Sequence, residues 1–130
     1  MAKWTNDLVL DNGLSWIGSS VDKMYLIKAY TPGDSYATVV GNKVAEVAMT
    51  SGDVPISDGA VNGRTVTVAA KNAITLTAST GTTPNLHIAL VKAAATSTVL
   101  AVTDETTNQE MASGIEVNIP SWTINISDPA

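Results

Sequence analysis

Apolar and polar residues alternate through much of the last third of the chain. In Ile115–Ile119 every second residue is apolar, and after a Pro120-Ser121 break the alternation returns in Trp122–Ile126. Because successive side chains leave a strand on opposite sides, this period-two pattern is typical of half-buried β-strands. The same criterion predicts further strands at Lys23–Tyr30, Arg64–Ala69, Ala73–Ala78, Leu86–Lys92 and Ser97–Thr103.

Turn-forming residues separate these segments at short intervals. Asp11-Asn12-Gly13, Pro32-Gly33-Asp34 and Asn62-Gly63 are examples, since Gly and Asn accept positive φ and Pro presets the first bend of a turn. Pieces of this length are too short for most helices. The pattern predicts an all-β, single-domain antiparallel β-sandwich, either jelly-roll-like or immunoglobulin-like.

Two further local predictions concern a hairpin and a segment that could be either helix or strand. Arg64–Ala69 and Ala73–Ala78 are read as a hairpin, with Ala70-Lys71-Asn72 as its short connection. Lys43–Met49 places apolar residues at helical spacing but follows a Gly-Asn turn. We expect a strand there rather than a helix.

The opening segment, residues 1–20, does not follow the strand pattern. It is expected to form an arm or hairpin beside a sandwich domain of residues 21–130. Large rigid aromatic side chains are favoured anchors of protein interfaces. Local packing, a protein interface and sugar stacking stay open for Trp4 and Trp16, in that order. The candidate protein-interface residues are Trp4, Leu8, Leu10, Leu14, Trp16 and Ile17.

Composition predicts that this domain shares its stability with neighbours. The chain of 130 residues is 45% hydrophobic, yet it has no Phe, three Trp and three Tyr. Large aromatic side chains each bury about 150–250 Å², so a core with few of them is thin per residue. We therefore expect a homo-oligomer, a dimer or trimer, or a docked partner.

Charge, hydrophobicity and cysteine content limit the classes of partner and the compartment to be expected. The net charge is −5 and the seven Lys and Arg residues are scattered, whereas nucleic-acid binding needs clustered cations. No run of eighteen apolar residues predicts a membrane span, and Met1–Leu10 lacks the pattern of a secretory signal. The absence of cysteine fits folding in a reducing cytoplasm. Neither a nucleic acid nor a membrane is expected as a partner.

Few residues suit catalysis or metal binding. His87 is the single histidine, on a predicted strand, where a surface or sheet-face position is the ordinary expectation. Asp53 and Asp58 flank a short loop and Asp104-Glu105 ends a strand, and neither spacing matches a calcium loop. The sequence therefore predicts no catalytic residue, no metal ligand and no cofactor, and a protein that is not an enzyme.

Five stretches of the chain together carry a family resemblance. They are Asp58–Val68, His87–Val91, Val99–Thr103, Ser113–Trp122 and Ile126–Ala130. Over these stretches, about half its length, the chain resembles small virion proteins of tailed bacteriophages, in particular their head decoration, or cement, proteins. No capsid-binding residue can be carried over from this resemblance, because the first fifty residues match much more weakly.

The resemblance implies an adhesive function. A cement protein made in the host cytoplasm would bind the major capsid protein on the outer surface of the virion. By spanning subunit junctions it would stabilise the head without any chemical step. The alternative is a receptor- or carbohydrate-binding β-sandwich module of a phage fibre or tail, which would need an exposed row or cluster of aromatic side chains.

Overall fold

A five-stranded antiparallel sheet forms the centre of the protein. The computed structural model describes residues 4–5, 13–58, 63–105 and 107–126. Neighbouring strands of the central sheet follow the order β1-β8-β7-β2-β3, and all of them pair antiparallel. Their bounds are β1 Trp4–Thr5, β2 Lys23–Ile27, β3 Lys43–Ala48, β7 His87–Lys92 and β8 Thr98–Asp104.

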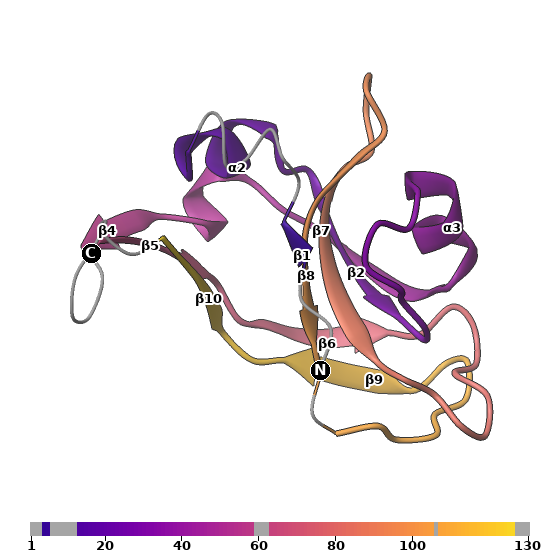
Figure 1. Cartoon of the computed structure of the whole chain (residues 1–130). Helices are drawn as coiled ribbons and strands as arrows, with labels where there is room; N and C mark the ends of the chain where they lie inside the picture. The colour runs from indigo at the N-terminus through magenta and orange to yellow at the C-terminus, as the bar shows by residue number, and fades with distance from the viewer. Residues whose placement is uncertain (1–3, 6–12, 59–62, 106, 127–130) are drawn as a thin grey trace.

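The remaining strands form a long bent ribbon on one side of this sheet (Figure 1). Strand β5 pairs with β10 and β4 in a three-stranded sheet, while β6 pairs with β9 alone. The β5–β10 pair and the β6–β9 pair share one register. Val68 lies opposite Trp122 in the first pair, and Lys71, three residues later, lies opposite Ile119 in the second. The bounds are β4 Ile56–Asp58, β5 Arg64–Val68, β6 Lys71–Thr75, β9 Glu116–Ile119 and β10 Trp122–Ile126.

Two local features interrupt the ribbon. Pro120 lies between β9 and β10, and proline has no backbone N–H to give to a strand ladder. Farther along, the register shifts between Lys71 and Ile74, where Ala73 has a positive φ of 55°. The N–H of Ala73 donates to the side-chain oxygen of Asn118 at 2.9 Å. The bend and the bulge together wrap the ribbon along the core.

Apolar residues fill both faces of the central sheet. One face packs against the ribbon and helix α2 (Ser15–Ser20), and its fully buried members include Met24, Leu90 and Leu100. The other face packs against helix α3 (Tyr36–Gly41), with Ile27 and Val91 fully buried there. Because both faces are covered, β7 is buried at five of its six positions instead of alternating.

Short polar caps fix the helices between strands. Ser35 precedes α3 and its side-chain oxygen accepts the N–H of Thr38 at 3.2 Å. A 3₁₀ turn, η1 (Ser51–Asp53), begins at Thr50, and the Asp53 carboxylate accepts the Thr50 N–H at 2.9 Å. Figure 1 shows α3 on the side of the central sheet opposite the ribbon.

The predicted all-β, antiparallel, single-domain class is confirmed. Lys43–Ala48 is a strand, as expected from the preceding turn. The predicted hairpin between Arg64–Ala69 and Ala73–Ala78 is wrong, because β5 and β6 follow one another along the same side of the ribbon and pair with β10 and β9. Within the opening segment, Ser15–Ser20 is a helix where an extended arm or hairpin was expected.

Candidate binding surface

An apolar groove opens where the three-stranded sheet extends past the core. It encloses about 350 Å³ between the start of α2 and the ends of β4, β5 and β10. Two isoleucines of the groove keep more than a third of their surface accessible, Ile56 at 36% and Ile126 at 37%. Both belong to the three exposed large hydrophobic residues in the described part of the chain. The lining residues are Gly13, Leu14, Ser15, Ile56, Arg64 and Ile126.

Strand register explains why Ile126 reaches solvent. Val66 of β5 is fully buried and lies opposite Ile56 on one side. Two residues earlier on the same strand face, Arg64 lies opposite Asp58 and Ile126. The core-facing side of the sheet therefore continues beyond the core and ends in a row that carries an exposed ion pair between Arg64 and Asp58. The groove combines apolar walls with a charged rim.

The structure divides the six predicted interface residues. Leu14 and Ile17 are buried in the core, at 5% and 0% exposure, and Trp16 is half-buried against it. Leu14 nevertheless lines the groove. The backbone of Trp4 pairs with Val102 in β8. Leu8 and Leu10 lie outside the described residues.

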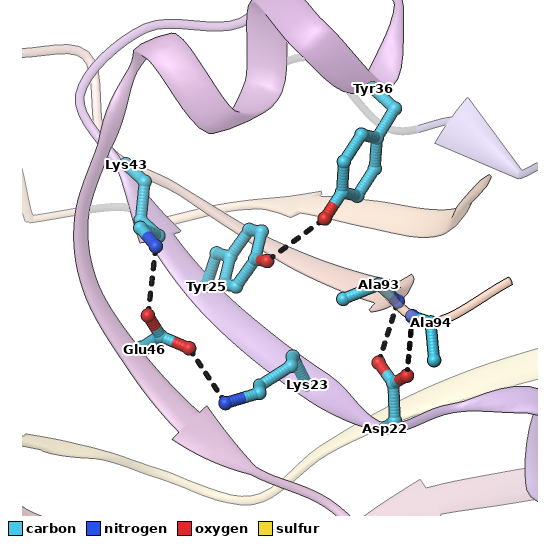
Figure 2. Close-up of polar contacts among 8 residues, drawn as sticks. All are labelled: Asp22, Lys23, Tyr25, Tyr36, Lys43, Glu46, Ala93 and Ala94. Atoms are coloured by element: carbon cyan, nitrogen blue, oxygen red, sulfur yellow. Dashed lines mark hydrogen bonds and ion pairs between the residues drawn. The ribbon is translucent and has the colours of Figure 1, made fainter. Parts of the chain in front are cut away.

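A network of charged and phenolic groups joins β2, β3 and α3 (Figure 2). Glu46 bridges Lys43 at 2.8 Å and Lys23 at 2.9 Å, and the Lys43 hydrogen bond is the main reason the pKa of Glu46 lies below its usual value. The Lys43 ammonium also lies 4.9 Å from the ring centre of Tyr25. Burial, followed by the Tyr36 hydroxyl contact at 3.2 Å, raises the pKa of Tyr25.

This network has a structural role rather than the shape of a reaction site. Every member is held by a neighbouring strand or helix of the same chain, and the ion pairs stand on the outer side of the sheet. The ion pairs join β3 to β2, and the Tyr25–Tyr36 hydroxyl contact joins α3 to β2, beside the apolar cluster that α3 covers.

His87 lies on strand β7, as expected, and of the two expected positions, surface or sheet face, its buried side chain excludes the surface. Its side chain is fully buried, with its ring 5.6 Å from that of Tyr30. Nδ1 lies 2.9 Å from the carbonyl oxygen of Asn85, and because a carbonyl can only accept, Nδ1 carries the proton. Nε2 lies 3.5 Å from a carboxylate oxygen of Asp104 without hydrogen-bond geometry. Histidine here connects the ends of β7 and β8.

A second groove of about 420 Å³ lies between the central sheet and β9. Its floor includes Leu26 and Ile88, and Met111 lines one wall. Three hydrogen bonds between Thr80 and Met111 hold that wall: the Thr80 N–H and hydroxyl donate to the Met111 carbonyl at 2.9 and 3.3 Å, and the Met111 N–H donates to the Thr80 hydroxyl oxygen at 2.8 Å. The groove is preformed, yet its rim lacks a converging set of charged groups.

The described residues contain neither a metal-binding cluster nor a membrane-spanning helix. No group of three or more His, Cys, Asp or Glu side chains there could hold a metal ion. No helix among those residues is long and apolar enough to cross a membrane. Comparison of the chain with protein-family models, curated proteins and solved structures returned no match.

Sequence reasoning did not identify the groove residues as a set. Ile126 was placed on a predicted strand and Ile56 in a loop between two acids. The available signal was weak: Ile56 is an isolated large apolar residue among Ser, Pro and Asp. Their neighbourhood depends on the pairing of β4, β5 and β10, which spacing along the chain does not encode.

Proposed function

We propose that this chain is a non-enzymatic virion structural protein that binds the outer surface of a phage capsid across subunit junctions and stabilises the head. The groove carries the proposal, because it is an apolar surface at the edge of a stiff aliphatic-cored domain. Exposed apolar patches on soluble domains often mark sites of protein interaction. The sequence resemblance to phage decoration proteins supplies the nature of the partner, the major capsid protein.

Adhesion by many weak contacts suits a domain of this size. A stable protein interface buries about 1,200–2,000 Å² in total, and each copy that touches two capsid subunits makes its second contact intramolecular. Modest individual interfaces then add up to strong retention on the shell. The same avidity would resist opening of the shell, since the contacts across a junction must break together.

The arrangement of aromatic residues favours this proposal over a receptor- or carbohydrate-binding module. Sugar-binding surfaces use exposed aromatic faces. Among the aromatic side chains whose burial the structure describes, Tyr25 and Tyr30 are buried, Tyr36 is half-buried, and Trp16 and Trp122 are half-buried against the core.

Capsid binding can be tested with matched isoleucine variants. Ile126→Asp places a charge in the groove, whereas Ile115→Asp places the same charge at an isoleucine that is 46% exposed and outside it. Undecorated heads should retain the wild type and Ile115→Asp but lose Ile126→Asp. Equal retention of both variants would contradict the groove assignment, and absence of wild-type binding, together with absence of the polypeptide from purified virions, would overturn the proposal itself.

Point variants are preferable to removal of the opening segment. Deleting residues 1–20 would also remove Leu14 and Ile17 from the core, so loss of binding could arise from unfolding. Circular dichroism of each point variant checks that the domain is intact before its binding is compared.

A further inference from the structure

We propose that the free edge of β10 pairs antiparallel with the same edge of a second copy of this chain. Strand β10 is the border of the three-stranded sheet, whose order is β10-β5-β4. All five residues of β10 pair with β5 on one side, and no strand among the described residues pairs with the other side. This inference does not rest on the capsid proposal, although Ile126 takes part in both surfaces, and it is tested at Thr123, which does not line the groove.

Hydrogen bonds on the far side of β5 reveal which groups of β10 point outward. The Thr67 N–H donates to the Pro55 carbonyl at 3.1 Å, toward β4. The backbone N–H and C=O groups of consecutive strand residues point to alternate sides, so those of Val66 point toward β10. The N–H and C=O groups of Ile124, which lies opposite Val66, therefore point toward β5. The neighbouring residues Thr123 and Asn125 direct their N–H and C=O groups away from the sheet.

The composition of β10 leaves this edge unprotected. Natural sheets commonly shield an edge with charged side chains, proline or a bulge. Strand β4, the opposite border, follows Pro55 and ends at Asp58, and the border strand β3 carries Lys43 and Glu46. Strand β10 reads Trp-Thr-Ile-Asn-Ile, with no charge and no proline, and its register with β5 is continuous.

The sequence of β10 is complementary to itself. Apolar residues occupy its first, third and fifth positions, and polar residues the second and fourth. A two-fold axis at Ile124 places Thr123 opposite Asn125 of the second copy, which pairs all the outward N–H and C=O groups of those two residues. Ile126, which is 37% exposed, then lies beside Trp122 of the second copy. Each apolar side chain then lies opposite an apolar one, and each polar side chain opposite a polar one.

The edge of β10 borders an open slot of about 260 Å³, which is lined along β10 by residues 122–125 and along β8 by residues 101–103. A strand of the same alternating sequence fits this edge with apolar residues opposite apolar ones and polar residues opposite polar ones, and β10 of a second copy supplies such a strand. Five residues on each side form a small interface, so the dimer should be reversible and dependent on concentration.

Thr123→Pro tests the inference selectively. It removes an outward N–H while leaving the ladder with β5 formed by Trp122, Ile124 and Ile126. Thr123→Val changes the side chain but keeps the N–H and is the matched control. Sedimentation velocity over a concentration series should show a monomer–dimer equilibrium for the wild type and Thr123→Val, and at least a tenfold weaker association for Thr123→Pro.

Three results would overturn the inference. The first is a wild type that stays monomeric over the whole series, and the second is a folded Thr123→Pro that dimerises as well as wild type. The third is a monomeric wild type whose capsid binding is lost in Thr123→Pro, which would assign the edge to a capsid strand. Asn125→Lys provides a second variant, which should weaken the dimer by charge while leaving the N–H in place.

Discussion

The carboxylate of Asp22 accepts the backbone N–H of Ala93 at 2.7 Å, across 71 positions of sequence. Its second oxygen accepts the N–H of Ala94 at 2.9 Å. Figure 2 shows both bonds reaching from the residue before β2 to the end of β7. The connection between β7 and β8 begins here and projects from the sheet (Figure 1). One side chain thus anchors the base of this projecting turn.

Removing that anchor should loosen the turn. Asp22→Ala leaves the two N–H groups without their charged acceptor, and hydrogen bonds to charged groups contribute about 1.5–3 kcal/mol. We expect the free energy of unfolding to fall by about 1–3 kcal/mol and the amides of Ala93 and Ala94 to exchange faster with solvent. Asp34→Ala is the control, because Asp34 accepts the Thr31 N–H within its own turn. Unchanged amide exchange in Asp22→Ala would contradict the anchor.

The free energy of unfolding should fall in acid, because the folded protein stabilises the ionised carboxylates of Asp53 and Glu46. A hydrogen bond from Lys71, followed by the Thr50 N–H, lowers the pKa of Asp53, and Lys43 and Lys23 lower the pKa of Glu46. A pKa lower in the folded state stabilises the fold above the unfolded value of about 3.9–4.3. That contribution is lost as pH falls through the folded pKa. Denaturant unfolding from pH 7 to pH 3 should show the decline below about pH 4.3.

The matched comparison for acid sensitivity is the double variant Glu46→Gln and Asp53→Asn. It should be less stable than wild type at neutral pH, because the ion pairs are gone. Its free energy of unfolding should also change less steeply between pH 5 and pH 3. A slope equal to that of wild type would assign the acid sensitivity to other carboxylates.

Local sequence patterns predicted the strands better than their pairing. In Arg64–Val68, alternation correctly placed Val66 and Val68 in the core, but Thr65, which was expected to face solvent, is buried as well, and only Thr67 is half-exposed. The same pattern could not reveal that β5 pairs with β10 rather than with β6. That choice depends on Pro120 and on the bulge at Ala73, which let a long ribbon bend where a hairpin turn was expected.

The candidate surface was less predictable than the fold. Leu14 and Ile17 were expected to face a partner because they follow no strand pattern, but a short helix turns them into the core. Ile126 continues a regular alternation, and its exposure arises only because the core ends before the strand does. Whether a residue at the end of a strand or helix is buried depends on residues that are distant in sequence, so a short stretch of sequence does not reveal it.

His87 and Asp104 should be energetically coupled. Asp104→Ala removes the carboxylate that lies 3.5 Å from Nε2 of the buried imidazole, and because no hydrogen bond joins the two groups, any coupling between them is electrostatic. His87→Leu removes the imidazole, so the further change to Ala at position 104 should then cost less. A double-mutant cycle by denaturant unfolding should give a coupling energy of about 0.5–3 kcal/mol. Additive effects would show that the pair does not interact.

The bulge at Ala73 should prefer glycine over any branched residue. Ala73 has a φ of 55°, a left-handed conformation that costs an L-residue about 1–2 kcal/mol and costs glycine little. Ala73→Gly relieves that strain but adds freedom to the unfolded chain, at about 0.4–1 kcal/mol, so its stability should equal or slightly exceed that of wild type. Ala73→Val should be destabilised, because a β-branched side chain is poorly tolerated at positive φ. Thermal unfolding of both variants checks this order, and a Val variant more stable than the Gly variant would contradict the left-handed bulge.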